Sequence, residues 1–175
     1  MHTQRGFTLV ELLVTLSIIG MLTFYAIPSL YHFYANNKLW LYTQKFTQTL
    51  TLARSEAIKR NSEVLICPIE HTKQCASGNN WNKRWMIFVD NNKNRKWEKE
   101  EPVLRRTHFD DSPISIRSTR KSRIIYFSNG KSAGSNASFI FCDGRGADYA
   151  KAVILSNSGR FRVTDKKSDG EKLSC

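Results

Sequence analysis

The amino-acid sequence predicts an α+β fold, in which a long N-terminal helix with a membrane-spanning first half packs on an antiparallel β-sheet head. Three observations support this fold class. An apolar run covers residues 7–27, and its only ionisable side chain is Glu11. Apolar residues then recur at helical steps to about residue 60, after which short runs of Val, Ile and Phe alternate with Gly, Asn and Ser. A helix followed by consecutive strands is the element order of an α+β domain.

The apolar run is long enough to span a membrane. Its 21 residues match the length that a helix needs to cross a hydrocarbon core about 30 Å thick. Its flanks differ from those of a secretory signal, because Arg5 and Gly6 precede the run and no small-residue cleavage site follows it. A cut after Gly6 would leave the helix on the mature protein, with Glu11 near its new end. A carboxylate in lipid needs a charged partner, and the new α-amine is the obvious one.

Residues 5–13, Arg-Gly-Phe-Thr-Leu-Val-Glu-Leu-Leu, resemble the processing site of type IV pilins and pseudopilins. The resemblance implies that a prepilin peptidase cuts after Gly6 and methylates the amine of Phe7. It also implies that Glu11 neutralises the amine of a neighbouring pilin when the helices pack into a filament. The protein would then be a single-pass protein of the bacterial inner membrane that moves to the periplasm and a cell-surface pilus. A plain single-pass anchor is the alternative.

Pro28 should end or kink the first helix, and a helical pattern resumes directly after it. One apolar stripe of this second part is expected to pack on the head, and it comprises Leu39, Tyr42, Phe46, Leu50, Ala53 and Ala57. The predicted divisions are a leader (1–6), a transmembrane and assembly helix (7–28), the outer half of the N-terminal helix (29–61) and a β-rich head with a C-terminal tail (62–175). Residues 51–61 resemble the corresponding stretch of the FimT/GspH minor pilins.

Eight short strands are expected in the head, with one sheet face packed on the helix stripe. Asn-Gly at 129–130 and Asn-Ser-Gly at 157–159 are turn signals. The candidate strands are 63–69, 85–89, 103–109, 114–118, 124–128, 138–142, 152–156 and 161–164.

The four cysteines all follow the span, on the side that a cytoplasmic leader with Arg5 would send outward. An even number in an exported domain indicates two disulfides, although four cysteines allow three pairings. We favour Cys67 with Cys75, which closes a short loop, and Cys142 with Cys175, which pins the tail. No cofactor is indicated, and a metal site is disfavoured because no C-x-x-C occurs and the histidines do not cluster with the cysteines.

A calcium loop is the other metal candidate. Asp90 and Glu101 have the acidic spacing of an EF-hand loop, with Asn92 and Asn94 between them. However, Arg95 takes the position of the turn glycine, and three lysines of the same segment would repel a cation. We therefore favour a solvated loop.

The net charge of +12 and the pI of about 9.8 predict an anionic partner or, more simply, good solubility. More than half of this excess lies between residues 117 and 163, which contain nine basic and two acidic side chains. In a strand, Arg160 and Arg162 would share one face, roughly 6.5–7 Å apart, with Phe161 on the other. That spacing matches the distance between successive phosphates of a nucleic-acid strand. Contacts of the two guanidiniums with phosphates would carry no information about the base sequence. The alternative is that Arg160 and Arg162 form the solvent-exposed side of an edge strand, where charged side chains protect the strand from aggregation.

Residues 142–146, 152–156 and 159–162 resemble the C-terminal half of FimT-type minor pilins. In that family a Gly-Arg-x-Arg motif is associated with DNA binding during natural transformation, which implies this role for Gly159, Arg160 and Arg162. Lys166 and Lys167, on a tail that could act as a flexible arm, are expected to extend the footprint, together with Arg145.

The leading prediction is therefore a minor pilin that binds extracellular DNA through phosphates, independently of sequence. Its rival is a structural pseudopilin, similar to GspH, that helps to build a secretion or pilus filament and binds only other pilins. The sequence does not indicate an enzyme, because no nucleophile with a base, paired carboxylates or phosphate loop stands out.

Overall fold

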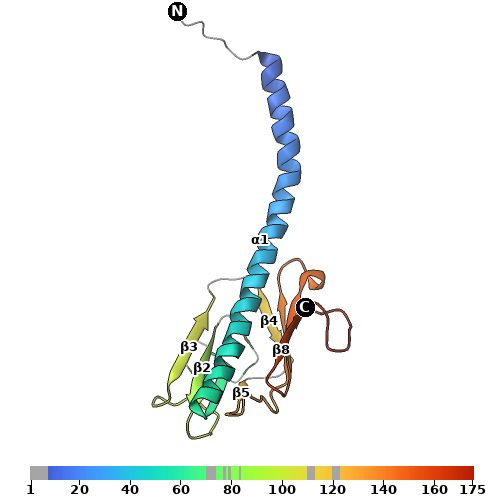
Figure 1. Ribbon diagram of the computed structural model, residues 1–175. Coiled ribbons are helices and arrows are strands. Elements are labelled where there is room, and N and C mark those ends of the chain that lie inside the picture. Colours follow the sequence, from blue (N-terminus) through green and yellow to red (C-terminus); the bar gives the residue numbers. More distant parts are fainter. Residues whose placement is uncertain are drawn as a thin grey trace, which may run out of the picture. The chain divides into compact units, whose positions relative to one another are not determined.

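The computed structural model describes residues 8–69, 74–76, 78, 80–82, 84–109, 113–119 and 123–175. Within these residues it contains one long helix and eight strands (Figure 1). The elements are α1 (Leu9–Arg60), β1 (Glu63–Pro68), β2 (Arg84–Asp90), β3 (Val103–His108), β4 (Ser115–Ser118), β5 (Ile124–Tyr126), β6 (Ala137–Cys142), the 3-10 helix η1 (Ala147–Tyr149), β7 (Lys151–Leu155) and β8 (Phe161–Thr164). Every strand lies within a residue or two of its predicted bounds.

The first part of α1 is apolar and solvent-exposed along its length. It begins with a capping box, in which Glu11 N–H donates to Thr8 Oγ1 at 3.3 Å and Thr8 N–H donates to the Glu11 carboxylate at 3.0 Å. By length and composition α1 is the one described helix that could cross a membrane. Pro28 was expected to end or kink the helix, and it does not end it, since α1 continues through it as one long helix. The proline removes one backbone hydrogen bond. The many hydrogen bonds of the long helical segments on either side outweigh the free-energy cost of that loss.

The second part of α1, from Leu39, belongs to the head, which forms a compact unit from Leu39 to Cys175. The head contains two four-stranded antiparallel sheets, ordered β3-β2-β1-β5 and β4-β6-β7-β8. The expectation of a single sheet is therefore corrected. Both sheets place their inner faces against the predicted stripe of α1, all six residues of which are buried.

The break between the sheets has a local cause at β5. The side chains of Ser132 and Ser135 occupy the main-chain groups of Ile125 that a further strand would need: Ser132 Oγ donates to the Ile125 carbonyl at 2.7 Å, and Ile125 N–H donates to Ser135 Oγ at 3.1 Å. Both serines are buried. The chain therefore leaves the first sheet at this point and returns at Ala137 to the second sheet, to which β4 already belongs.

The centre of the core is aromatic. The Phe46 ring of α1 lies 4.6–5.9 Å, centroid to centroid, from the rings of Trp81, Trp85, Phe139 and Phe141, which come from both sheets and the loop before β2. Trp85 Nε1 donates to Thr49 Oγ1 of α1 at 3.0 Å. Burial of these rings against one helix fixes both sheets to α1.

Two disulfides staple the outer faces of the sheets. Cys67 is bonded to Cys75 on the first sheet, and Cys142 is bonded to Cys175 at the end of the chain, which is the pairing favoured from the sequence. Each disulfide is part of a small apolar cluster on the face of its sheet that points away from α1. Leu173 is buried in the second cluster, so the C-terminal tail covers part of the outer face of the second sheet.

Candidate nucleic-acid interface

The Gly-Arg-Phe-Arg segment starts in the turn between β7 and β8. Gly159 N–H donates to the Ser156 carbonyl at 2.9 Å, and Ser156 N–H donates to the Arg160 carbonyl at 2.9 Å, which closes the hairpin. Gly159 has a φ of +77°, in the left-handed region that glycine adopts without a steric cost. The turn therefore needs glycine at the first position of the segment.

A second constraint on Gly159 comes from the neighbouring turn of the first sheet. A Cβ at position 159 would overlap the carbonyl oxygen of Gly130 and meet the Tyr126 ring at 3.2 Å. The Tyr126 hydroxyl donates to the Gly159 carbonyl at 3.4 Å, and burial raises the pKa of Tyr126 well above its ordinary value, so this donor stays protonated. Ser132 N–H also donates to the Asn157 carbonyl, at 3.0 Å. The turn that precedes Arg160 is thus locked to the other sheet.

Arg160 and Arg162 are both exposed at the free edge of the second sheet. Arg160 ends the turn, and β8 begins one residue later than a strand that contains both arginines would require. Arg162 is paired in register with Ile154, on the outer face of the sheet, while Phe161 opposite Leu155 packs against the core on the α1 side. Within the described part of the chain, neither guanidinium makes an ion pair with an acidic side chain. Two charges are therefore available to an anionic partner.

The C-terminal tail is held in place, so the expectation of a flexible arm is corrected. Lys167 pairs with Glu171 at 2.9 Å, and this hydrogen bond raises the Lys167 pKa. An isolated antiparallel β-bridge between Lys166 and Lys172 folds the tail back on itself, and the disulfide from Cys175 to Cys142 fixes its end to β6. Lys166 is exposed, and the ion pair of Lys167 is itself accessible, so both remain next to β8 as basic groups on a rigid segment.

Arg145 does not join this surface. Its side chain is only 6% exposed, it contacts the Asp143 carboxylate with an Nη2–Oδ2 distance of 2.7 Å, and its guanidinium lies 4.2 Å from the centroid of the Tyr149 ring. An arginine with these partners stabilises the loop before η1 and would have to leave them to reach a phosphate. The predicted contribution of Arg145 to binding is therefore withdrawn.

Arg117 is a basic residue that the sequence did not single out. It is exposed on β4, the opposite edge of the second sheet, and its register with Ile140 places it on the same outer face as Arg162. Three strand spacings between β4 and β8, together with an offset of two residues along the strands, separate the two arginines by about 16 Å. Strand pairing alone creates this relationship, since 45 residues separate them in sequence and no local pattern links them.

The two other predicted features lie elsewhere. The proposed cut between Gly6 and Phe7 falls outside the described residues; of the three residues predicted to act in processing and assembly, the structure describes Glu11, in its capping box with Thr8. In the Asp90–Glu101 loop, Asp90 accepts hydrogen bonds from the N–H groups of Asn94 and Arg95, and Glu101 accepts from that of Asn91. Arg95 has a φ of +61°. Among the residues that the structure describes, no three His, Cys, Asp or Glu side chains form a group that could hold a metal.

Comparisons with known proteins identify a family for this chain, one similar protein and a similar fold. Residues 42–159 match the family described as Type II transport protein GspH, and residues 1–27 match the prokaryotic N-terminal methylation motif. The chain is 36% identical over 109 residues to the pilin-like protein PilA1 of Thermus thermophilus, a match that spans 61% of each protein. The fold is similar to two crystal forms of the type IV minor pilin FimU of Pseudomonas aeruginosa. Their TM-scores are 0.58 and 0.54, with 18% and 16% identity, and they cover 79% and 75% of this chain and 96% and 95% of the FimU chains.

Proposed function

Because this chain belongs to the GspH family of type IV minor pilins and pseudopilins, we propose that it is a filament subunit whose head captures extracellular DNA for uptake in natural transformation. The family is one of structural filament subunits rather than enzymes. Its N-terminal motif implies processing by a prepilin peptidase, an anchor in the inner membrane and later assembly with other pilins into a periplasmic or surface filament. A leader of residues 1–6 and a mature terminus at Phe7 are part of the proposal.

The observation that carries the DNA proposal is the pair Arg160 and Arg162. Both guanidiniums are exposed on a free sheet edge, and the locked turn at Gly159 fixes where that edge begins. Guanidiniums bind phosphate oxygens bidentately, and backbone contacts of this kind read no bases. Lys166 and Lys167 extend the basic surface on one side, and Arg117 extends it across the outer face. The net charge of +12 favours the approach of a polyanion.

A structural pseudopilin without DNA binding is the second candidate. The family description favours it, since GspH is named as a type II transport protein. In that case the charges of Arg160 and Arg162 protect the free edge of β8 from pairing with other strands.

A DNA titration of the full-length protein in non-ionic detergent separates these candidates. We expect duplexes of unrelated sequence to bind equally, and log K to fall linearly with log salt. Arg160→Gln combined with Arg162→Gln should reduce the steepness of that slope by about 1.8, or 0.9 per lost phosphate contact. The control is Arg105→Gln combined with Arg106→Gln, which removes the same charge from the exposed edge of the other sheet. Equal losses in both variants, or no binding at low salt, would favour the structural pseudopilin.

A further inference from the structure

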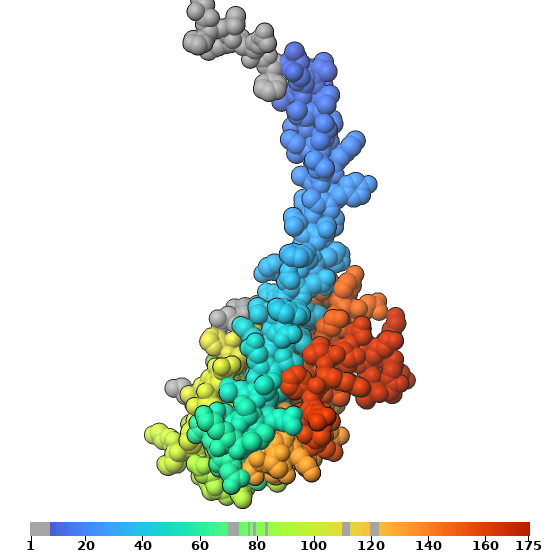
Figure 2. Space-filling model, viewed as in Figure 1, coloured from blue at the N-terminus to red at the C-terminus, as the bar shows by residue number. Residues whose placement is uncertain are grey.

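A groove runs along the outward face of α1 within the head. It lies between β3 and β8, which are the free edges of the two sheets (Figure 1), and Figure 2 shows α1 at the surface between these two segments. The wider part has a volume of about 650 Å³ and is lined by α1 from Gln44 to Ser55, by Arg105 of β3 and by Phe161 and Val163 of β8. The twelve helical residues from Gln44 to Ser55 make this part about 16 Å long, which is the length of about five residues of extended chain.

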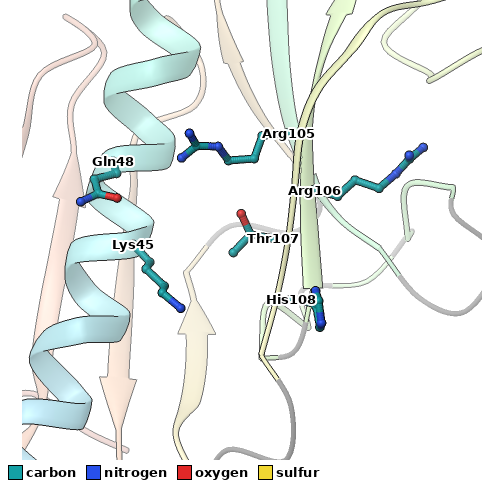
Figure 3. A pocket seen from close by; sticks show the side chains of 6 residues that line it. All are labelled: Lys45, Gln48, Arg105, Arg106, Thr107 and His108. Carbon is teal, nitrogen blue, oxygen red and sulfur yellow. The ribbon is translucent and has the colours of Figure 1, made fainter.

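One end of the groove is a basic pocket of about 270 Å³ that shares Gln48 and Arg105 with the wider part. Figure 3 shows Arg105 pointing from β3 toward α1 and Lys45 pointing from α1 into the space between α1 and β3, with Thr107 below Arg105; the Gln48 side chain lies against α1. The Lys45 ammonium lies 4.8 Å from the centroid of the Phe109 ring, which holds it at the rim. Arg106 points away from α1 and lies over the Trp97 ring, at 5.7 Å. All the described residues that line the pocket are basic or neutral.

The opposite end of the groove is apolar. Phe161 and Val163 belong to the inner face of β8, and Leu52 of α1 lies beside them. Val163 is 47% exposed, which leaves an uncovered apolar surface at this end. An occupant that fits both ends therefore carries a carboxylate at one end and an apolar side chain at the other. The groove is bounded on one side by Arg105 of β3 and on the other by Phe161 and Val163 of β8.

We propose that this groove docks an extended acidic segment of a different pilin in the filament, with a carboxylate between Lys45 and Arg105 and an apolar side chain against Phe161 and Val163. The family places the head of this protein beside other pilins after assembly. The net charge of +12 disfavours a second copy as the occupant, because like-charged chains repel each other. The free edges of β3 and β8 offer backbone donors and acceptors to an extended segment. The inference does not depend on DNA binding.

Photo-crosslinking in cells that assemble the filament tests this docking. The full-length chain carries benzoylphenylalanine in place of Gln48, which is exposed and lines both parts of the groove, or in place of the exposed Lys99 as a control position. We expect the position-48 probe to join an acidic segment of another pilin, identified by mass spectrometry of the joined peptides. Adding Arg105→Glu should reduce this product about tenfold, because a like charge then faces the bound carboxylate.

Arg106→Glu is the matched control, since it makes the same charge change one residue away on the side that faces away from α1. It should leave the product unchanged, and thermal unfolding should show that both variants are folded. The proposal is overturned if the position-48 probe gives no more product than position 99, if it joins only DNA, lipid or a second copy of this chain, or if Arg106→Glu causes the same loss as Arg105→Glu. None of these outcomes changes the DNA titration of the Arg160 and Arg162 variant.

Discussion

At the scale of single residues, the Gly-Arg-Phe-Arg segment combines a glycine that the fold requires with two arginines that we propose bind phosphate. The glycine is required twice, for its positive φ and for its contact with the Gly130 carbonyl. The arginines have no such structural duty, because both side chains are exposed and Arg162 reaches out from a strand whose core contact is Phe161. Substitutions can therefore separate the stability of the segment from its proposed binding.

Gly159→Ala should destabilise the head more than Gly134→Ala. The two glycines have nearly equal φ values, +77° and +75°, so alanine adds a similar backbone strain of about 1–2 kcal/mol at each. Only at Gly159 does the new Cβ also collide with a backbone carbonyl, whereas nothing lies within 4 Å of it at Gly134. We expect Gly159→Ala to cost at least about 1 kcal/mol more in urea unfolding. Equal losses in the two variants would mean that the two turns separate easily.

The Asp143–Arg145 pair should make stability depend on pH in acid. Burial by itself raises the Asp143 pKa, but the hydrogen bonds and charge of Arg145 outweigh it, so the folded-state pKa lies below its usual value. The stabilisation is therefore complete above the unfolded pKa of about 4 and is lost as the pH falls through the lower, folded value.

Asp143→Asn should lower the free energy of unfolding by about 3 kcal/mol at neutral pH, since it leaves a nearly buried guanidinium without its partner. The difference from the parent should shrink below about pH 4. Asp148→Asn is the control, because its pair with Lys172 is exposed and contributes less than about 1 kcal/mol. A constant difference from neutral pH to about pH 2 would contradict this account of the pair.

At the scale of elements, α1 carries the organisation of the head. Its buried stripe contacts both sheets, and its outward face forms the floor of the groove between β3 and β8. One helix thus has a packing side and a docking side, and the two sides can be tested by substitutions two residues apart.

Phe46→Ala should be among the most destabilising single changes in the head. The ring is fully buried among four aromatic side chains from both sheets, and its removal leaves a cavity that they cannot fill without moving. We expect a loss of about 4 kcal/mol in urea unfolding. Gln48→Ala, on the exposed side of the same helix, should cost less than about 0.5 kcal/mol. A small effect of Phe46→Ala would show that the sheets hold together without α1.

At the scale of the whole molecule, the head depends on two staples as well as on its core. The Cys67–Cys75 bond closes a separation of 8 residues, and the Cys142–Cys175 bond closes one of 33. The second bond also keeps Leu173 over the outer face of the second sheet, next to the strand that carries the proposed DNA contacts.

Replacing Cys142 and Cys175 by serine should destabilise the head more than replacing Cys67 and Cys75. Loop-closure entropy gives about 3.7 kcal/mol for the longer separation and about 2.5 kcal/mol for the shorter one. The first double variant should also admit hydrogen exchange into β7, where the tail no longer covers Ala152. The reverse order of stabilities, measured by urea unfolding, would show that local packing rather than chain entropy dominates at these bonds.

Much of this architecture follows from local patterns. The eight strands were predictable because most are short runs rich in Val, Ile and Phe between turn residues, and the α1 stripe was predictable because its residues recur at helical steps. The local pattern at Pro28 left an end and a kink both open, since a local rule cannot weigh one lost hydrogen bond against a 52-residue helix. The division into two sheets was not predictable, because it depends on two serine hydroxyls that replace a neighbouring strand at Ile125.

The sequence by itself determined the membrane helix, the processing motif, the element order and the Gly-Arg-Phe-Arg segment, because each depends on residues close together in the chain. Only the tertiary structure decided which basic side chains are accessible. Arg145 forms a nearly buried ion pair with Asp143, and the tail is bound to the sheet by a disulfide. Arg117 lies on the same outer face as Arg162. Strand register, burial and ion pairing set these relationships, and all three join residues that are distant in sequence or depend on which surfaces become covered.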